Sequence, residues 1–109
     1  MNNEDIAIVI GHDRINKGAY SPFINQYEYD YNKGVADIMG LDTYTHTLNT
    51  SYRAKMKRTY SKLSHYDLTL EMHFNAAPAS VQGVEALYFH TNKQGREIAE
   101  LYCDLVAKE

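Results

Sequence analysis

The alternation of apolar and polar positions predicts where the strands of this chain lie. Between Leu68 and Asn75 every second residue is apolar, which is the period of a strand with one buried face. Ile6–Ile10 is apolar at every position, as in a central strand covered on both faces. Residues 43–48 predict a third strand near a sheet edge. Residues 83–89 predict a fourth, whose short connection to the 68–75 strand favours antiparallel pairing and a mixed sheet.

Helical spacing of apolar residues predicts three helices. The first runs from Tyr27 to Gly40, with Glu28 at the border of its apolar stripe. The second follows Asn49, Thr50 and Ser51, which supply N-cap chemistry, and the third begins near Lys93. The expected buried stripes are Tyr27, Tyr31, Val35 and Ile38 or Met39 in the first helix, Tyr52, Met56, Tyr60 and Leu63 in the second, and Ile98, Leu101, Tyr102, Leu105 and Val106 in the third. Residues 13–26 lack a clear period and predict a loop beside a cleft.

Composition narrows the class of protein. A chain of 109 residues that is 44% hydrophobic predicts one domain, residues 1–109, with one modest core. The net charge of -3 argues against a general nucleic-acid binder. The single cysteine, Cys103, excludes an internal disulfide. No apolar run approaches the ~20 residues of a membrane helix, and the N-terminus lacks a Sec signal, so we expect synthesis in the cytoplasm without membrane insertion. These features predict no oligomeric state.

Three side chains stand out as candidate metal ligands. His12 follows the first strand, Glu28 begins the first helix, and His73 ends the 68–75 strand. Each has an ordinary alternative role, such as a surface histidine or a favourable charge in a helix's first turn. Together, two imidazoles and a carboxylate form a suitable ligand set for a catalytic zinc ion with a fourth position left for water. His46 is expected in mid-strand and is interpreted as structural or solvent-facing.

Several separated motifs occur in a recognisable order. They are Ile8–His12, Lys17–Ala19, Glu28, Asp67–Ala76 and Gly83–Glu85. With these motifs the chain resembles the zinc-dependent N-acetylmuramoyl-L-alanine amidases of the Amidase_3 type, along nearly its whole length. The resemblance implies an α/β fold, phosphorylase/hydrolase-like, in which helices flank a mixed twisted sheet.

The resemblance also implies a site and a reaction. His12, Glu28 and His73 would bind Zn²⁺, and Asn75 is a candidate substrate contact. Zinc would activate water to cleave the amide between N-acetylmuramic acid and L-alanine in peptidoglycan. Because no export signal is present, a phage endolysin is favoured over another bacterial cell-wall hydrolase, and the enzyme would act on the wall after release or export.

Two departures from the family pattern leave alternatives open. Glu71 stands where the family usually has a small hydroxyl residue, and it is either a partner that orients a ligand or, as we prefer, an ordinary exposed strand residue. The family's general-base glutamate lies on a later strand, so we expect it beyond Glu109, in a domain that is incomplete here. Within the chain, Glu71 is a candidate for the general base, but a weaker one than a glutamate beyond Glu109. The alternative functions are another zinc peptidase acting on stem peptides and a non-catalytic module that binds zinc or the cell wall.

Overall fold

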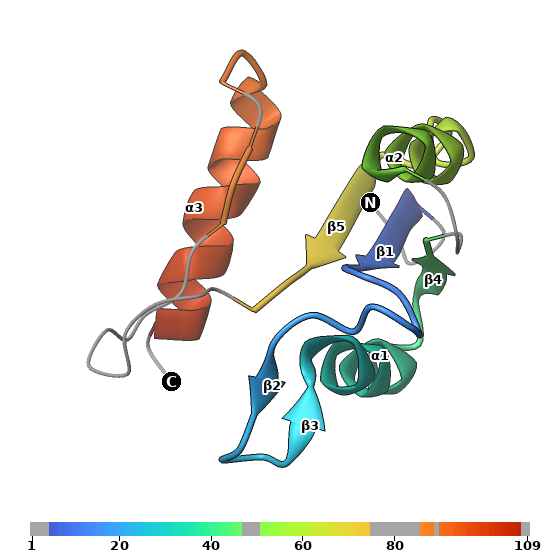
Figure 1. Cartoon of the computed structure of the whole chain (residues 1–109). Helices are drawn as coiled ribbons and strands as arrows, with labels where there is room; N and C mark the ends of the chain where they lie inside the picture. The colour runs from blue at the N-terminus through green and yellow to red at the C-terminus, as the bar shows by residue number, and fades with distance from the viewer. Residues whose placement is uncertain (1–4, 47–50, 75–85, 89, 108–109) are drawn as a thin grey trace. The chain divides into compact units, whose positions relative to one another are not determined.

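A computed structural model of the chain describes residues 5–46, 51–74, 86–88 and 90–107. These residues form an α/β arrangement in which helices flank a parallel sheet (Figure 1). The elements are β1 (Ile6–Ile10), β2 (Tyr20–Ser21), β3 (Gln26–Tyr27), α1 (Glu28–Met39), β4 (Asp42–Thr45), α2 (Tyr52–Ser61), β5 (Leu68–Met72) and α3 (Lys93–Ala107).

The main sheet has the strand order β4-β1-β5, and both pairings are parallel. Ile10, at the end of β1, lies opposite Thr45 on one side and Met72 on the other. The carboxyl ends of all three strands therefore lie at one edge of the sheet. The chain leaves β1 for one neighbour and later returns to pair with β1's other side, which makes the gap between β1 and β5 a switch point of the kind where ligands bind.

Strand β1 is buried because helices cover both of its faces. Ile8 and Ile10 pack with Tyr29 and Ala36 of α1. Ala7 and Val9 pack on the opposite face with Leu63, which follows α2. The continuous apolar run thus predicted a covered central strand, and this prediction is confirmed, as is the edge position of β4.

A short antiparallel hairpin, β2–β3, leads into α1 and replaces part of the loop predicted for residues 13–26. The N-cap residue Tyr27 provides no side-chain cap. Instead, the backbone amides of Glu28 and Tyr29 donate to the carbonyls of Ala19 and Lys17, at 2.7 and 3.0 Å. Two of the amides that a helix start leaves unpaired are therefore satisfied by the segment that leads into β2.

The predicted apolar stripe of α1 is wrong by one residue, a rotation of about 100°. Tyr31, which was expected inside, is 40% exposed, and Ile38 and Met39, one of which was expected inside, are 88% and 44% exposed. The buried positions are Glu28, Tyr29, Asn32 and Ala36. Because the hairpin anchors the first turn and Glu28 points into the protein, contacts outside the helix set its rotation. Gly40 ends the helix in the left-handed conformation, with φ of 69°, as predicted.

The predicted second helix and its cap are confirmed, since the Ser51 hydroxyl accepts a hydrogen bond from the Ala54 amide at 3.2 Å. Three details differ. Tyr52 is 76% exposed and Tyr60 is 38% exposed, although both were expected on the buried stripe, and β4 ends at Thr45, so His46 follows the strand instead of lying within it.

The predictions of a mixed sheet and of a fourth strand are wrong for the described residues. Within the described residues the main sheet is entirely parallel. Ala86–Tyr88, the described part of the strand expected at residues 83–89, does not form a strand. Contacts divide the chain into two units, Met1–Phe74 and Asn75–Glu109. In the second unit, Ala86 and Tyr88 line one pocket together with Ala99 and Cys103 of α3. The buried stripe predicted for α3 is wrong at most positions, because four of its members are exposed: Leu101, Tyr102, Leu105 and Val106.

None of the helices in the described ranges combines the length and the apolar character that crossing a membrane requires.

A buried ion pair ties the loop after β1 to α2. Lys55 donates to Asp13 at 2.7 Å, and the Asp13 side chain is 2% exposed. The other carboxylate oxygen of Asp13 accepts from the amides of Ile15 and Asn16. Burial by itself would raise the pKa of Asp13, but the bonds from Lys55 and the two amides outweigh it and hold the pKa well below its usual value.

Truncating Ile8 should destabilise the fold because its side chain is fully buried against α1. We expect Ile8→Ala to lower the free energy of unfolding by about 2–5 kcal/mol and Ile8→Val by about 0.5–1.5 kcal/mol. Urea unfolding followed by circular dichroism measures both. Ile38→Ala, at a position 88% exposed, is the matched control and should change stability by less than about 0.5 kcal/mol. Equal losses at the two positions would contradict the core described above.

Removing the Asp13 charge should also destabilise the protein, by about 3 kcal/mol in Asp13→Asn at neutral pH, because Lys55 then loses its buried partner. Since the folded-state pKa of Asp13 lies below the ordinary value of about 4, this stability is present above about pH 4 and is lost as the pH falls through the folded pKa. Unfolding measured between pH 3 and pH 7 should therefore show the two proteins converging in acid.

The control is Asp30→Asn, which breaks the half-exposed pair with Lys17. Exposed pairs contribute about 0–1 kcal/mol, so this variant should stay close to wild type at every pH. A constant difference between wild type and Asp13→Asn across the pH range would contradict the assignment.

Candidate metal centre

His12 is placed by the end of the buried strand β1. The amide of Gly11 donates to the Met72 carbonyl of β5 at 3.0 Å, which extends the strand pairing by one residue. His12 then turns out of the sheet with a positive φ of 67°. A side chain other than glycine in this region stores strain, and such residues cluster at functional sites.

Glu28 is the first residue of α1, and its carboxylate is almost completely buried, at 3% exposure. One oxygen, Oε1, accepts from the Ala19 amide at 3.3 Å. The other, Oε2, lies between the two candidate histidines. The helix dipole favours a negative charge here, but burial makes partners necessary, since an unpaired buried carboxylate is costly.

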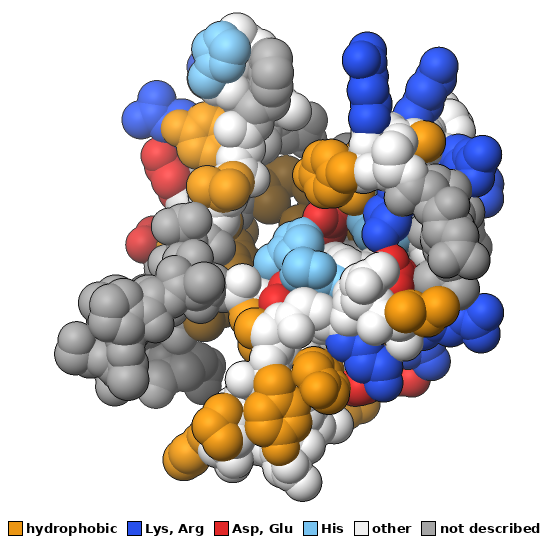
Figure 2. Space-filling view, in the orientation of Figure 1, with side chains coloured by type: hydrophobic (Ala, Val, Ile, Leu, Met, Phe, Trp, Pro, Cys, Tyr) orange, Lys and Arg blue, Asp and Glu red, His pale blue; other side chains and the backbone are white. Residues whose placement is uncertain are grey.

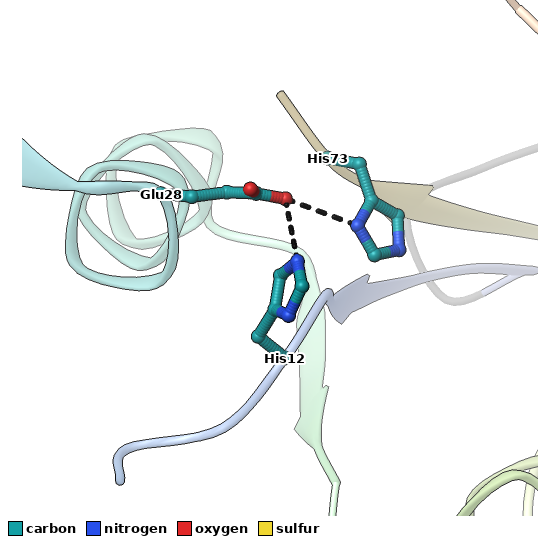
Figure 3. Close-up of side chains that lie close together, drawn as sticks. All are labelled: His12, Glu28 and His73. Carbon is teal, nitrogen blue, oxygen red and sulfur yellow. Dashed lines mark hydrogen bonds and ion pairs between the residues drawn. The ribbon is translucent and has the colours of Figure 1, made fainter. Parts of the chain in front are cut away.

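The three candidate side chains meet at one point (Figure 3). Glu28 Oε2 lies 3.1 Å from His12 Nε2 and 3.0 Å from His73 Nδ1. The imidazole rings of His12 and His73 stand edge to face, with centroids 5.2 Å apart. On the surface shown in Figure 2, histidine and acidic side chains lie together between the basic side chains over α2 and the apolar side chains over β2 and β3.

This donor set fits a divalent metal ion. One ligand atom from each of the three residues lies within 4.8 Å of the others. Ligand atoms about 2.0–2.1 Å from a zinc ion stand about 3.3 Å apart at tetrahedral angles, so the two measured separations from Glu28 need little adjustment. Two neutral imidazoles and one carboxylate are also the ligand types that leave an open position in catalytic sites.

Two glycines make room for these side chains. A Cβ atom on Gly11 would overlap the His73 ring, and one on Gly18 would lie 2.6 Å from His12 Cδ2 and 2.8 Å from Glu28 Oε1. Gly18 also has φ of 79°, a conformation that other residues rarely adopt. The backbone therefore approaches the candidate ligands more closely than any side chain would allow.

A second group of polar residues lies behind His73. Glu71 Oε2 accepts from His73 Nε2, and the Tyr60 hydroxyl donates to Glu71 Oε1 at 2.5 Å. His46 Nε2 is 3.3 Å from that same oxygen, although the two are not aligned as a hydrogen bond. His46 is fixed on its other side by Thr59, with Nδ1 and Oγ1 2.7 Å apart.

Opposing effects act on the titration of this group. Burial alone would lower the pKa of His73, but its bonds to Glu71 and Glu28 raise it above the usual value. Burial would raise the pKa of Glu71, but the bonds from Tyr60 and His73 lower it. Burial dominates at His46 and lowers its pKa despite the nearby Glu71. Without a metal ion, His73 and Glu71 thus favour a charged pair, whereas His46 favours the neutral form.

The structure brings His12, Glu28 and His73 together as the sequence predicted, although Glu28 is buried instead of lying at the border of an apolar stripe. Asn75, the candidate substrate contact, lies outside the described residues. The preferred interpretation of Glu71 as an ordinary exposed strand residue does not account for its contacts with His73 and Tyr60. His46 was missed because its strand was expected to continue past it; a strand ending at Thr45 would have marked it as another residue at a strand exit.

No protein-family model, curated protein or solved structure matches this chain. The geometry of the described side chains is therefore what supports a function.

Proposed function

We propose that the protein is a zinc hydrolase that cleaves the amide bond between N-acetylmuramic acid and L-alanine in peptidoglycan. The proposal of a bound metal ion rests on the convergence of His12, Glu28 and His73 at the carboxyl edge of a parallel sheet. The motif order in the sequence, as in Amidase_3 enzymes, supports the choice of substrate.

In this proposal the three side chains hold the ion through His12 Nε2, Glu28 Oε2 and His73 Nδ1. A bound zinc ion supplies Lewis acidity and lowers the pKa of water toward about 7. The protein's own part is to hold both imidazoles in place beside the Glu28 carboxylate, and to hold that carboxylate through the Ala19 amide.

Amide hydrolysis also needs a group that takes a proton from the attacking water. Among the described carboxylates, Glu71 contacts the His73 nitrogen that points away from Glu28. A group that removes a proton must come within hydrogen-bond reach of it. The position of Glu71 therefore favours a role acting through His73 over that of general base.

Zinc binding is the first testable consequence. Metal analysis after dialysis against Zn²⁺ should find one ion per chain. His12→Ala, Glu28→Gln and His73→Ala should each lose more affinity than the about 10- to 100-fold that removing an outer contact costs. His65→Ala is the matched control, because His65 is exposed and stacks on Tyr66 outside the site. Zinc retained equally by all four variants would exclude this site.

Product analysis tests the reaction itself. Purified peptidoglycan treated with the zinc-loaded full-length protein should release stem peptides that begin with a free L-alanine amino group, without new reducing ends on the glycan. His12→Ala should abolish the release, and His65→Ala should preserve it. New amino groups only within the stem would point to a peptidase instead, and binding to peptidoglycan without release of any product would point to a non-catalytic module.

A further inference from the structure

We propose that Glu71 is a positioning residue that holds His73 by its Nε2 nitrogen, so that Nδ1 faces the metal site. The inference rests on the proposed metal centre and adds a residue to it. Glu71 lies in β5, and His73 comes two positions later, directly after the strand ends at Met72. Side chains two positions apart along an extended chain lie on the same face, so these two can meet.

The His73 ring is held from both sides. Its Nδ1 lies 3.0 Å from Glu28 Oε2, and its Nε2 bonds to Glu71 Oε2. Figure 3 shows the second ring nitrogen on the side away from Glu28. A carboxylate at Nε2 keeps the proton on that nitrogen and leaves the Nδ1 lone pair free for a metal ion. It also increases the basicity of the ligating nitrogen.

Glu71 is itself fixed by two other elements. The Tyr60 hydroxyl, from α2, donates to Oε1, and His46, which follows β4, stands against the same oxygen. Thr59 of α2 then holds His46. One oxygen of Glu71 is thus committed to these supports and the other to His73, and the side chain is only 21% exposed.

This arrangement distinguishes positioning from general-base catalysis. Glu71 contacts Nε2 of His73 and Glu28 contacts Nδ1, so the imidazole ring separates the Glu71 carboxylate from the point where His12 and Glu28 converge. Glu71 therefore acts on the site through His73, and its support extends the site to β4 and α2. The ordinary strand residue that the sequence suggested would make no such contacts.

Competition with a chromophoric zinc chelator tests the proposal. We expect Glu71→Gln to lower zinc affinity about 10- to 100-fold, the usual effect of losing an outer carboxylate. Tyr60→Phe, which removes only the hydroxyl that supports Glu71, should cause a smaller loss in the same direction. The matched controls are Asp37→Asn, which removes one charge from an exposed position of α1, and Tyr52→Phe, which removes an exposed hydroxyl from α2. Both should bind zinc as wild type does.

Histidine ring ¹⁵N spectra of the zinc-loaded proteins give a readout that a loss of stability would not imitate. In wild type, His73 should show a protonated Nε2 and a metal-bound Nδ1. Glu71→Gln should shift the His73 Nε2 signal and leave His12 unchanged. If Glu71→Gln does not fold, Tyr60→Phe makes the same test through its effect on that signal.

Two failures can be told apart. If wild type binds zinc through His12, Glu28 and His73 but Glu71→Gln and Tyr60→Phe match it in affinity and in His73 spectra, Glu71 has no positioning role and the metal centre stands. If wild type binds no zinc, the metal centre fails, and the positioning role fails with it.

Discussion

The burial of β1 between two helices is the constraint on which the rest of this structure depends. The strand is apolar on both faces and bonded to a neighbour on each edge, so α1 and α2 must lie on opposite sides of the sheet. Parallel pairing then brings the ends of β1, β4 and β5 to one edge. His12, His46 and His73 follow these three strands, and a polar site at that edge is the direct consequence.

A buried carboxylate at the same edge completes the arrangement. Glu28 is drawn inside by the hairpin that anchors the first turn of α1, and its cost of desolvation is offset by the Ala19 amide and two imidazoles. Two histidines that share one carboxylate oxygen form an arrangement that could hold a metal ion. The close approach of Gly11 and Gly18 shows that the backbone around the site leaves no room for larger residues.

His73 has contacts on both sides of its ring, with Glu28 at Nδ1 and with Glu71 at Nε2. Glu71 joins His73 to Tyr60 and His46, which belong to different elements. Such a chain of contacts limits how far the ring of His73 can turn. It also explains why a charged residue is accommodated on a strand next to the core: each of its oxygens has a partner.

Local pattern in the sequence determined the strand at Ile6–Ile10, the end of α1 at Gly40, the start of α2 and the identity of the three candidate ligands. It also determined the start of β5 at Leu68, although that strand was expected to reach Asn75 and ends at Met72. These features depend on neighbouring residues, through period, caps and the position of a polar residue after an apolar run. Tertiary structure alone decided the rotation of α1, the burial of Glu28, and the contacts of Glu71 with Tyr60 and His46. Those depend on side chains distant in sequence, and the free energy of burying a polar group is known only once its partners are in place.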